Sequence, residues 1–200
     1  MKEEVSKSCW EEIWSRFREG DKEAFAQLYN LHINALYSYG TKLCKDEDAI
    51  KDSLQEIFLD FYLRRLKLNL SAEKLKYYLL LALKRSLIKK MEAGRKLVHR
   101  LNESADFQPD YSIEFQMIEY EKDDEIRQKV VKALNQLPAG QKEAIYLRYN
   151  ESLEYSEVAQ ILNITVESVR KQVFRALKTI REIIDNQSVT ILFSFFHKKS

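Results

Sequence analysis

The sequence is poor in the residues that build tight turns and covalent cross-links. Its 200 residues include four glycines, two prolines and two cysteines. So little glycine and proline disfavours a fold rich in turns and strands and favours helices. Cys9 and Cys44 are too few for a disulfide scaffold, and no histidine stands at metal-ligand spacing from either. We therefore predict no catalytic residue, no metal and no cofactor.

Long apolar runs are missing as well. The longest, from Tyr77 to Leu83, is far shorter than the roughly 20 residues that a bilayer-spanning helix needs. The opening residues, MKEEVSKSCWEEIW, include acids and lack the apolar centre of a signal peptide. The sequence therefore predicts a cytoplasmic protein with no membrane span.

The formal net charge of +2 conceals an uneven distribution. Residues 1–95 carry 18 Lys and Arg against 15 Asp and Glu, residues 96–124 carry 3 against 8, and residues 125–200 carry 12 against 8. Two mildly basic segments around an acidic one indicate two domains and a linker. We predict an all-α fold of two small helical domains joined by a flexible acidic linker, with boundaries at 1–96, 97–124 (linker), 125–186 and 187–200 (an apolar C-terminal tail).

Residues 155–184 predict a helix-turn-helix. Asn163 stands at the corner, where Asn tolerates a left-handed backbone better than most residues, and Thr165 is expected to cap the second helix. Apolar residues three and four apart predict the buried row of that second helix. The row consists of Val166, Val169, Val173, Ala176, Leu177 and Ile180.

The opposite face of the second helix has one sign of charge. Between Ser168 and Arg181 there are five cations and no acid, and Phe174 lies among them. Because solvated helix faces usually mix charges, a basic face with an exposed aromatic favours an anionic partner. A helix of this size fits the DNA major groove. The predicted contact residues are Ser168, Arg170, Lys171, Phe174, Arg175 and Lys178.

Two helices are predicted before this region, over residues 21–43 and 48–65. Asp21 is expected to cap the first, which turns Phe25, Tyr29 and His32 inward, and the second turns Tyr62 inward with other aromatics. The second helix has an acidic outer strip. The strip serves either solubility or docking of a partner helix that carries cations; its members are Asp52, Gln55, Glu56 and Asp60.

A loop over residues 66–73, with a cap at Ser71, leads to a long basic helix over residues 74–96. Eight cations accompany its apolar residues, against Glu92 alone. Cations interleaved with aromatics suit a single nucleic-acid strand, although Tyr77 could equally be a core residue. Further along, a helix is predicted at 125–135, a break at 137–140 and a new helix over 141–149.

Two stretches resemble known motifs. The string LPAGQKEAIYLRYNESLEYSEVAQILNITVESVRKQVFRALKTI resembles region four of extracytoplasmic-function (ECF) sigma factors of the sigma-70 family. Upstream, FAQLYNLHINALYSY and DEDAIKDSLQEIFLDFYLR resemble region two, whose hallmark falls at Asp52 to Phe58. The likeness covers about residues 21–184, with both regions in the expected order.

The resemblance implies a promoter-specificity subunit of RNA polymerase. Its expected partners are core polymerase and promoter DNA, and an anti-sigma factor is a further possible partner. It implies that the acidic strip docks on the polymerase clamp helices. The helix that begins at Val166 would read the −35 element. The loop and the basic helix would hold the melted −10 strand through Leu68, Asn69, Ser71, Tyr77, Lys84, Arg85 and Lys89.

The main alternative is a stand-alone helix-turn-helix regulator that binds operators without polymerase. Such proteins usually dimerise on two-fold sites. That alternative leaves the acidic strip and the long basic helix without a role. A helical hydrolase has little support, because no nucleophile constellation or glycine-rich phosphate loop is visible.

Overall fold

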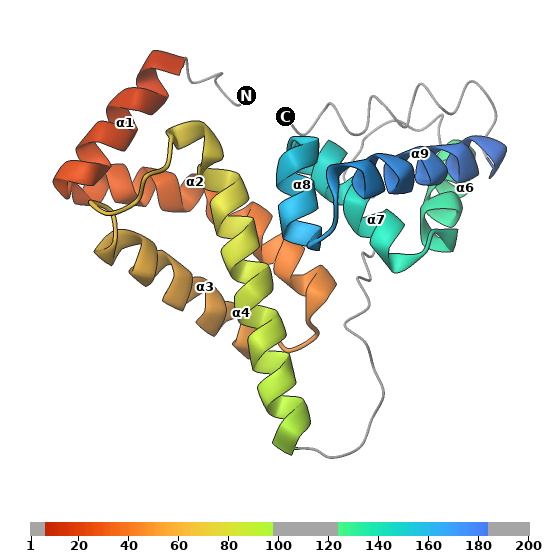
Figure 1. Ribbon diagram of the computed structural model, residues 1–200, viewed down its shortest axis with the longest axis horizontal. Coiled ribbons are helices and arrows are strands. Elements are labelled where there is room, and N and C mark those ends of the chain that lie inside the picture. Colours follow the sequence, from red (N-terminus) through yellow and green to blue (C-terminus); the bar gives the residue numbers. More distant parts are fainter. Residues whose placement is uncertain (1–6, 98–123, 184–200) are drawn as a thin grey trace. The chain divides into compact units, whose positions relative to one another are not determined.

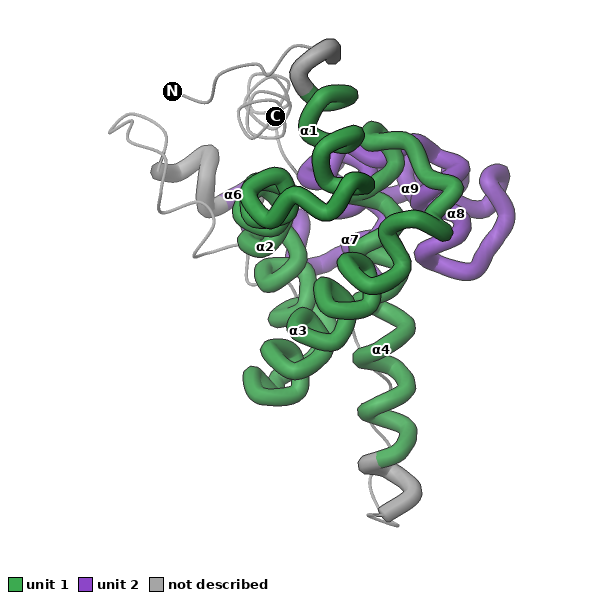
Figure 2. Tube along the Cα trace, turned by 90° about the vertical axis from the view of Figure 1, so that its left-hand side faces the viewer, with its two compact units in different colours: residues 1–103 green, residues 104–200 purple. Residues whose placement is uncertain are grey.

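The computed structural model describes residues 7–97 and 124–183 of the chain. Every element of secondary structure in the described residues is helical, which confirms the all-α prediction. The chain divides into two compact units, unit 1 (residues 1–103) and unit 2 (residues 104–200) (Figure 2). The predicted tail, and the predicted linker apart from its two end residues, lie outside the described residues.

Unit 1 contains helices α1 (Lys7–Glu19), α2 (Lys22–Leu43), α3 (Glu47–Leu63) and α4 (Leu75–Leu97), with the short 3-10 helix η1 (Ala72–Lys74) before α4. Helices α2, α3 and α4 pack against one another pairwise, and α1 packs on α2 (Figure 1). The predicted N-cap at Asp21 is confirmed, since its Oδ1 accepts a hydrogen bond from Glu23 N at 2.8 Å.

Aromatic rings and one glycine set the packing of unit 1. Phe17 and Phe61 stack with ring centroids 4.5 Å apart, and Trp14 lies against both. Gly40 of α2 faces Ile50 of α3 so closely that an added Cβ would lie 2.8 Å from Ile50 Cγ2. The absence of a side chain at Gly40 therefore allows α2 and α3 to approach.

His32 points inward as predicted, and only 8% of its surface is exposed. Burial lowers the pKa of His32 to about 4, and the positive charge of Lys76 on α4 acts in the same direction. Because a buried imidazolium would lose hydration without gaining an acidic partner, His32 is neutral at neutral pH.

Unit 2 contains α6 (Asp124–Gln136), α7 (Ala139–Ile145), α8 (Tyr155–Leu162) and α9 (Val166–Ile183). A π-helical turn, η2 (Tyr146–Asn150), continues α7. The predicted helix over 141–149 is therefore confirmed, with two differences: the α-helix begins at Ala139, just after Pro138, and it widens into a π turn from Tyr146. Helix α9 packs on α6, α7 and α8, so it is the centre of this unit.

The corner of the helix-turn-helix is formed as predicted. Asn163 adopts the left-handed conformation, with φ 54° and ψ 44°. Thr165 Oγ1 accepts a hydrogen bond from Ser168 N at 3.1 Å, which confirms the cap at the start of α9. The turn sends the chain from α8 directly into the helix predicted to contact DNA.

Candidate functional site

Helix α9 separates a buried row from an outward face. Val169, Val173, Ala176 and Ile180 are buried, whereas Val166, predicted to join them, stays exposed at the helix start. The six predicted contact residues lie away from that row, and Phe174 exposes 69% of its surface. An aromatic ring this exposed on a well-packed helix is available to a partner.

The outward face of α9 is less uniform in charge than its central sequence predicts. Lys171 pairs with Glu167 at 2.6 Å, and Lys178 pairs with Glu182 at 3.8 Å. Both acids lie just outside the acid-free stretch and reach into it at i,i+4 spacing. Such exposed pairs contribute about 0–1 kcal/mol, so an arriving anion can displace them. Within the described part of the chain, Arg175 has no acidic partner.

The residues predicted to hold a single strand come from two adjoining elements. Leu68, Asn69 and Ser71 lie in the segment between α3 and η1, and Ser71 makes no side-chain cap bond, so the predicted cap is wrong. The reason is that a 3-10 turn, not an α-helix, follows it. The rest lie on α4 away from its buried Leu79, Leu80, Leu83 and Leu87; they are Tyr77, Lys84, Arg85 and Lys89.

The acidic strip lies on the outer side of α3. Asp52, Gln55 and Glu56 are exposed and Asp60 is half-buried. Two of its carboxylates already have cationic neighbours: Glu56 Oε1 lies 3.2 Å from Lys90 Nζ on α4, and Asp60 Oδ1 lies 2.6 Å from Arg64 Nε. A cationic partner must therefore exchange these ion pairs rather than meet bare acids.

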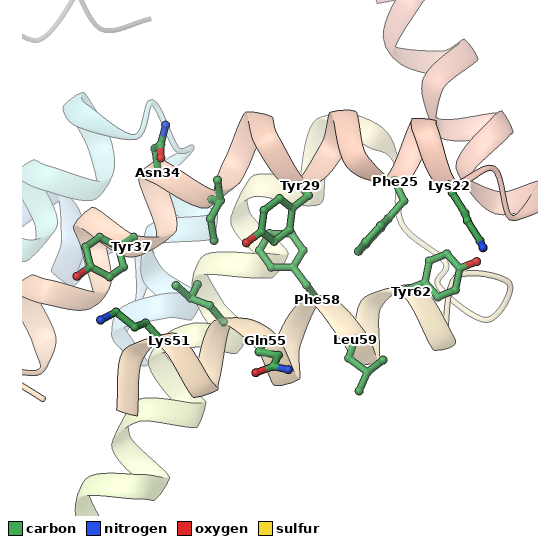
Figure 3. Close-up of a pocket in the computed structure, with 12 residues that line it drawn as sticks. Lys22, Phe25, Tyr29, Asn34, Tyr37, Lys51, Gln55, Phe58, Leu59 and Tyr62 are labelled. Carbon is green, nitrogen blue, oxygen red and sulfur yellow. The ribbon is translucent and has the colours of Figure 1, made fainter. Parts of the chain in front are cut away.

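Sequence reasoning missed an apolar groove of about 800 Å³ between α2 and α3 (Figure 3). Phe25, Tyr29 and Tyr62 were predicted to point into a closed core, but they line this open groove, and Tyr29 is 37% exposed. The helical periodicity placed them on the correct faces. Periodicity carries no information on whether a third element covers those faces.

The groove continues into the acidic strip through Gln55, which lines it beside Leu59. Leu59 is 57% exposed and extends the apolar lining of the groove toward solvent. In the sequence, the apolar Leu59 lies between Glu56 and Asp60 of the acidic strip. This leucine is the signal that could have predicted a surface that is both apolar and acidic.

Within residues 7–97 and 124–183, no group of three His, Cys, Asp or Glu side chains is arranged to hold a metal ion. Over the same residues, no helix combines the length and the apolar character that a membrane span requires.

Comparison with known proteins gives a consistent answer. Residues 127–180 match the family model for sigma-70, region 4, a range that includes α9 through Ile180. The chain is 23% identical over 164 residues to the ECF RNA polymerase sigma factor SigM of Bacillus subtilis, covering 78% of this chain and 93% of that protein. It is 25% identical to the ECF RNA polymerase sigma factor SigK of Mycobacterium ulcerans, covering 83% and 88%. Over most of its length the chain is therefore similar to ECF RNA polymerase sigma factors, and its residues 127–180 match region 4 of the sigma-70 family.

A solved structure of the same fold is the sigma factor RpoE of Bartonella quintana, crystallised with the anti-sigma factor NepR. The likeness covers 80% of this chain and 95% of that chain, with a TM-score of 0.55 and 23% identity. The helix-turn-helix, apart from the last three residues of α9, lies within the stretch that the region-four model matches.

Proposed function

We propose that this protein is the promoter-specificity subunit of RNA polymerase: it directs core polymerase to specific promoters and helps to open the −10 region. Sigma factors of this family are initiation factors rather than enzymes, and this one acts in the cytoplasm where polymerase and DNA meet. One observation carries the proposal. The cations and Phe174 of α9 face solvent within the stretch that matches sigma-70 region 4.

Recognition of the −35 element is assigned to the outward face of α9. Its N-terminal turns would enter the major groove, where Arg and Lys reach guanine edges and apolar groups meet thymine methyls. Arg175 and Phe174 are the side chains most available for this, since Arg175 has no acidic partner in the described residues and Phe174 packs against nothing that covers it. The full set is Ser168, Arg170, Lys171, Phe174, Arg175 and Lys178.

Opening of the −10 region is assigned to unit 1. Leu68, Asn69 and Ser71 would receive an unstacked base, while the outer face of α4 would neutralise the phosphates of the same strand. These contacts exist only after the duplex opens, so they shift the equilibrium toward melted DNA. The residues assigned to α4 are Tyr77, Lys84, Arg85 and Lys89.

Docking of core polymerase is assigned to Asp52, Gln55, Glu56 and Asp60. Carboxylates on an exposed helix suit a partner helix that carries cations. The apolar groove beside them provides nonpolar surface that the partner can bury. An anti-sigma factor is a further proposed partner of this ECF sigma factor.

The deciding experiment is run-off transcription with core polymerase and a library of genomic promoters. We expect discrete transcripts that require this protein and share upstream elements. A stand-alone regulator would instead form dimers in gel filtration, fail to retain core polymerase in a pull-down and support no run-off transcript. That outcome would overturn the proposal.

A further inference from the structure

Two arginines of unit 2 share one aromatic ring. Arg148 Cζ lies 4.9 Å from the centroid of the Tyr155 ring, and Arg170 Cζ lies 5.6 Å from the same centroid. Each distance is within the range of a cation–π attraction. Neither guanidinium is ion-paired with an acid in the part of unit 2 that the structure describes. The ring therefore contacts two guanidinium groups, and neither makes an ion pair among the described residues.

Arg148 reaches the ring because of the π-helical turn. The turn η2 widens the helix after Ile145 and carries Arg148 at its middle position. Arg148 Nη1 then donates a hydrogen bond to the Leu153 carbonyl oxygen at 2.7 Å, which fixes the guanidinium beside α8. The π turn ends the helical segment that begins with α7, and it places Arg148 beside the start of α8.

Tyr155 is itself held in place. It is the first residue of α8, whose start is fixed by a hydrogen bond from Glu154 N to Glu157 Oε2 at 2.8 Å. Tyr155 is also hydrogen-bonded to Tyr149, a residue of the same π turn as Arg148. A half-buried ring with both flanks fixed is a rigid support for the two arginines.

The two arginines come from different parts of the helix-turn-helix. Arg170 lies on α9 next to the predicted base-reading residues, and Arg148 lies in the turn that precedes α8. In a DNA-bound helix-turn-helix, the first helix crosses the sugar-phosphate backbone while the second enters the groove. A DNA strand carries a phosphate about every 3.4 Å of helix axis, so it presents repeated anions to paired guanidiniums.

We infer that Tyr155 is a positioning residue that holds Arg148 and Arg170 as a two-arginine clamp for the phosphates of one DNA strand. The inference rests on the proposed function, because it takes DNA to be the ligand of α9. Arg170 then contacts the backbone rather than a base, which leaves base reading to Arg175 and Phe174. Phosphate contacts fix the register of a protein on DNA without carrying sequence information.

The test is the salt dependence of DNA binding by the full chain, measured on a mixed-sequence duplex about three helical turns long. Each phosphate contact contributes about 0.9 to the slope of log K against log salt concentration. We expect Tyr155→Leu to lower this slope by about one to two units, since it releases both arginines. Tyr155→Phe keeps the ring and should keep the slope of the unaltered protein.

Two charge variants control the measurement. Arg170→Met alters an exposed residue, so the fold should survive, and we expect the slope to fall by about one unit. Lys45→Met removes the same charge from the exposed turn before α3, far from the assigned DNA contacts in the sequence, and should leave the slope unchanged. Thermal melts by circular dichroism report whether each variant is folded.

The clamp is overturned if the unaltered chain shows no salt-dependent duplex binding, if folded Tyr155→Leu keeps the full slope, or if Tyr155→Phe loses as much as Tyr155→Leu. If Tyr155→Leu does not fold, an unchanged slope for Arg170→Met overturns the clamp instead. Run-off transcription separates this outcome from failure of the proposed function. Duplex binding with the expected slopes but no run-off transcript would leave the clamp standing and remove the sigma-factor role.

Discussion

The two units present charge in opposite ways. In unit 1, the carboxylates Glu56 and Asp60 on the surface of α3 are already paired with Lys90 and Arg64. In unit 2, Arg170 rests on a tyrosine ring and Arg175 has no acidic partner among the described residues. A partner of unit 1 must exchange ion pairs, whereas a polyanion meets the central arginines of α9 without displacing an acid. We therefore expect binding by unit 2 to depend more steeply on charge.

The units also differ in how their buried residues relate to function. Helix α9 contacts α6, α7 and α8, the other α-helices described in unit 2, so the same helix forms the core and carries the proposed DNA-contacting face. In unit 1, the core is shared among α2, α3 and α4, and the outer faces of α3 and α4 can change more independently. The following changes test this contrast, beginning with the largest expected effect.

Mild acid should affect unit 1 first. The pKa of His32 falls to about 4 in the folded protein from an ordinary value of 6.5, so the unfolded chain takes up a proton at a higher pH than the folded chain. The contribution of neutral His32 to the free energy of unfolding is fully present above pH 6.5. It is lost as the pH falls toward about 4, by about 3 kcal/mol in total. Both tryptophans, Trp10 and Trp14, lie in unit 1, so their emission during urea unfolding measures this loss.

His32→Leu is the matched control for the acid experiment. It keeps an apolar side chain at a buried position and removes the titrating group, so the dependence of unfolding on pH in this window should flatten. An unchanged pH dependence in His32→Leu would assign the acid sensitivity to other groups.

Arg175→Ala should strongly reduce transcription from cognate promoters. A direct base contact contributes about 1–3 kcal/mol, which corresponds to roughly a tenfold to hundredfold loss of −35 binding. Run-off transcription and a pull-down with core polymerase measure the two effects separately, and polymerase binding should not change. Arg181→Ala provides the comparison, because Arg181 is also an exposed arginine and lies in the last turn of α9. Equal losses for both variants would contradict a specific role for Arg175.

Gly40→Ala should destabilise unit 1 without replacing any of the proposed contact residues. The added Cβ would lie 2.8 Å from Ile50 Cγ2, so α2 and α3 must separate or Ile50 must change rotamer. Overpacking of this kind costs about 1–3 kcal/mol. Urea unfolding followed by tryptophan emission should show a lower midpoint, and Gly40→Ala with Ile50→Val should recover part of it. A midpoint equal to that of the unaltered protein would mean that the contact relaxes freely.

Glu56→Lys should weaken core polymerase binding by the smallest amount, about 1 kcal/mol, because the site is exposed and screened. Lys90→Met breaks the same ion pair from the other side and leaves Glu56 available, so polymerase binding should hold or improve slightly. Competition pull-downs at low and high salt measure both. If both variants weaken polymerase binding equally, binding depends on the Glu56–Lys90 ion pair and not on the charge of Glu56 alone.

The sequence predicted the helix-turn-helix closely because its signals are local. The Asn163 corner, the Thr165 cap and the buried Val169 and Val173 each depend on nearby residues along one helix or turn. The all-α class followed from the same helical periodicity.

The features that were missed depend on contacts between elements. The ion pair of Glu56 with Lys90 joins α3 to α4, and the groove beside Tyr29 exists because of how α2 meets α3. The π turn that carries Arg148 looks like an ordinary helix in the sequence, since no residue type marks the widened turn. Pairing across elements is a property of the packed molecule rather than of any one segment.

The π turn limits where the length of this chain can vary. An α-helix turns about 100° per residue, so loss of one residue between Tyr146 and Asn150 would rewind the turn and swing Arg148 away from Tyr155. Relatives that share the two-arginine arrangement should therefore keep the residue spacing from α7 to α8 fixed. Insertions and deletions that distinguish one relative from another should fall outside this segment, where a change of length does not rotate a helix.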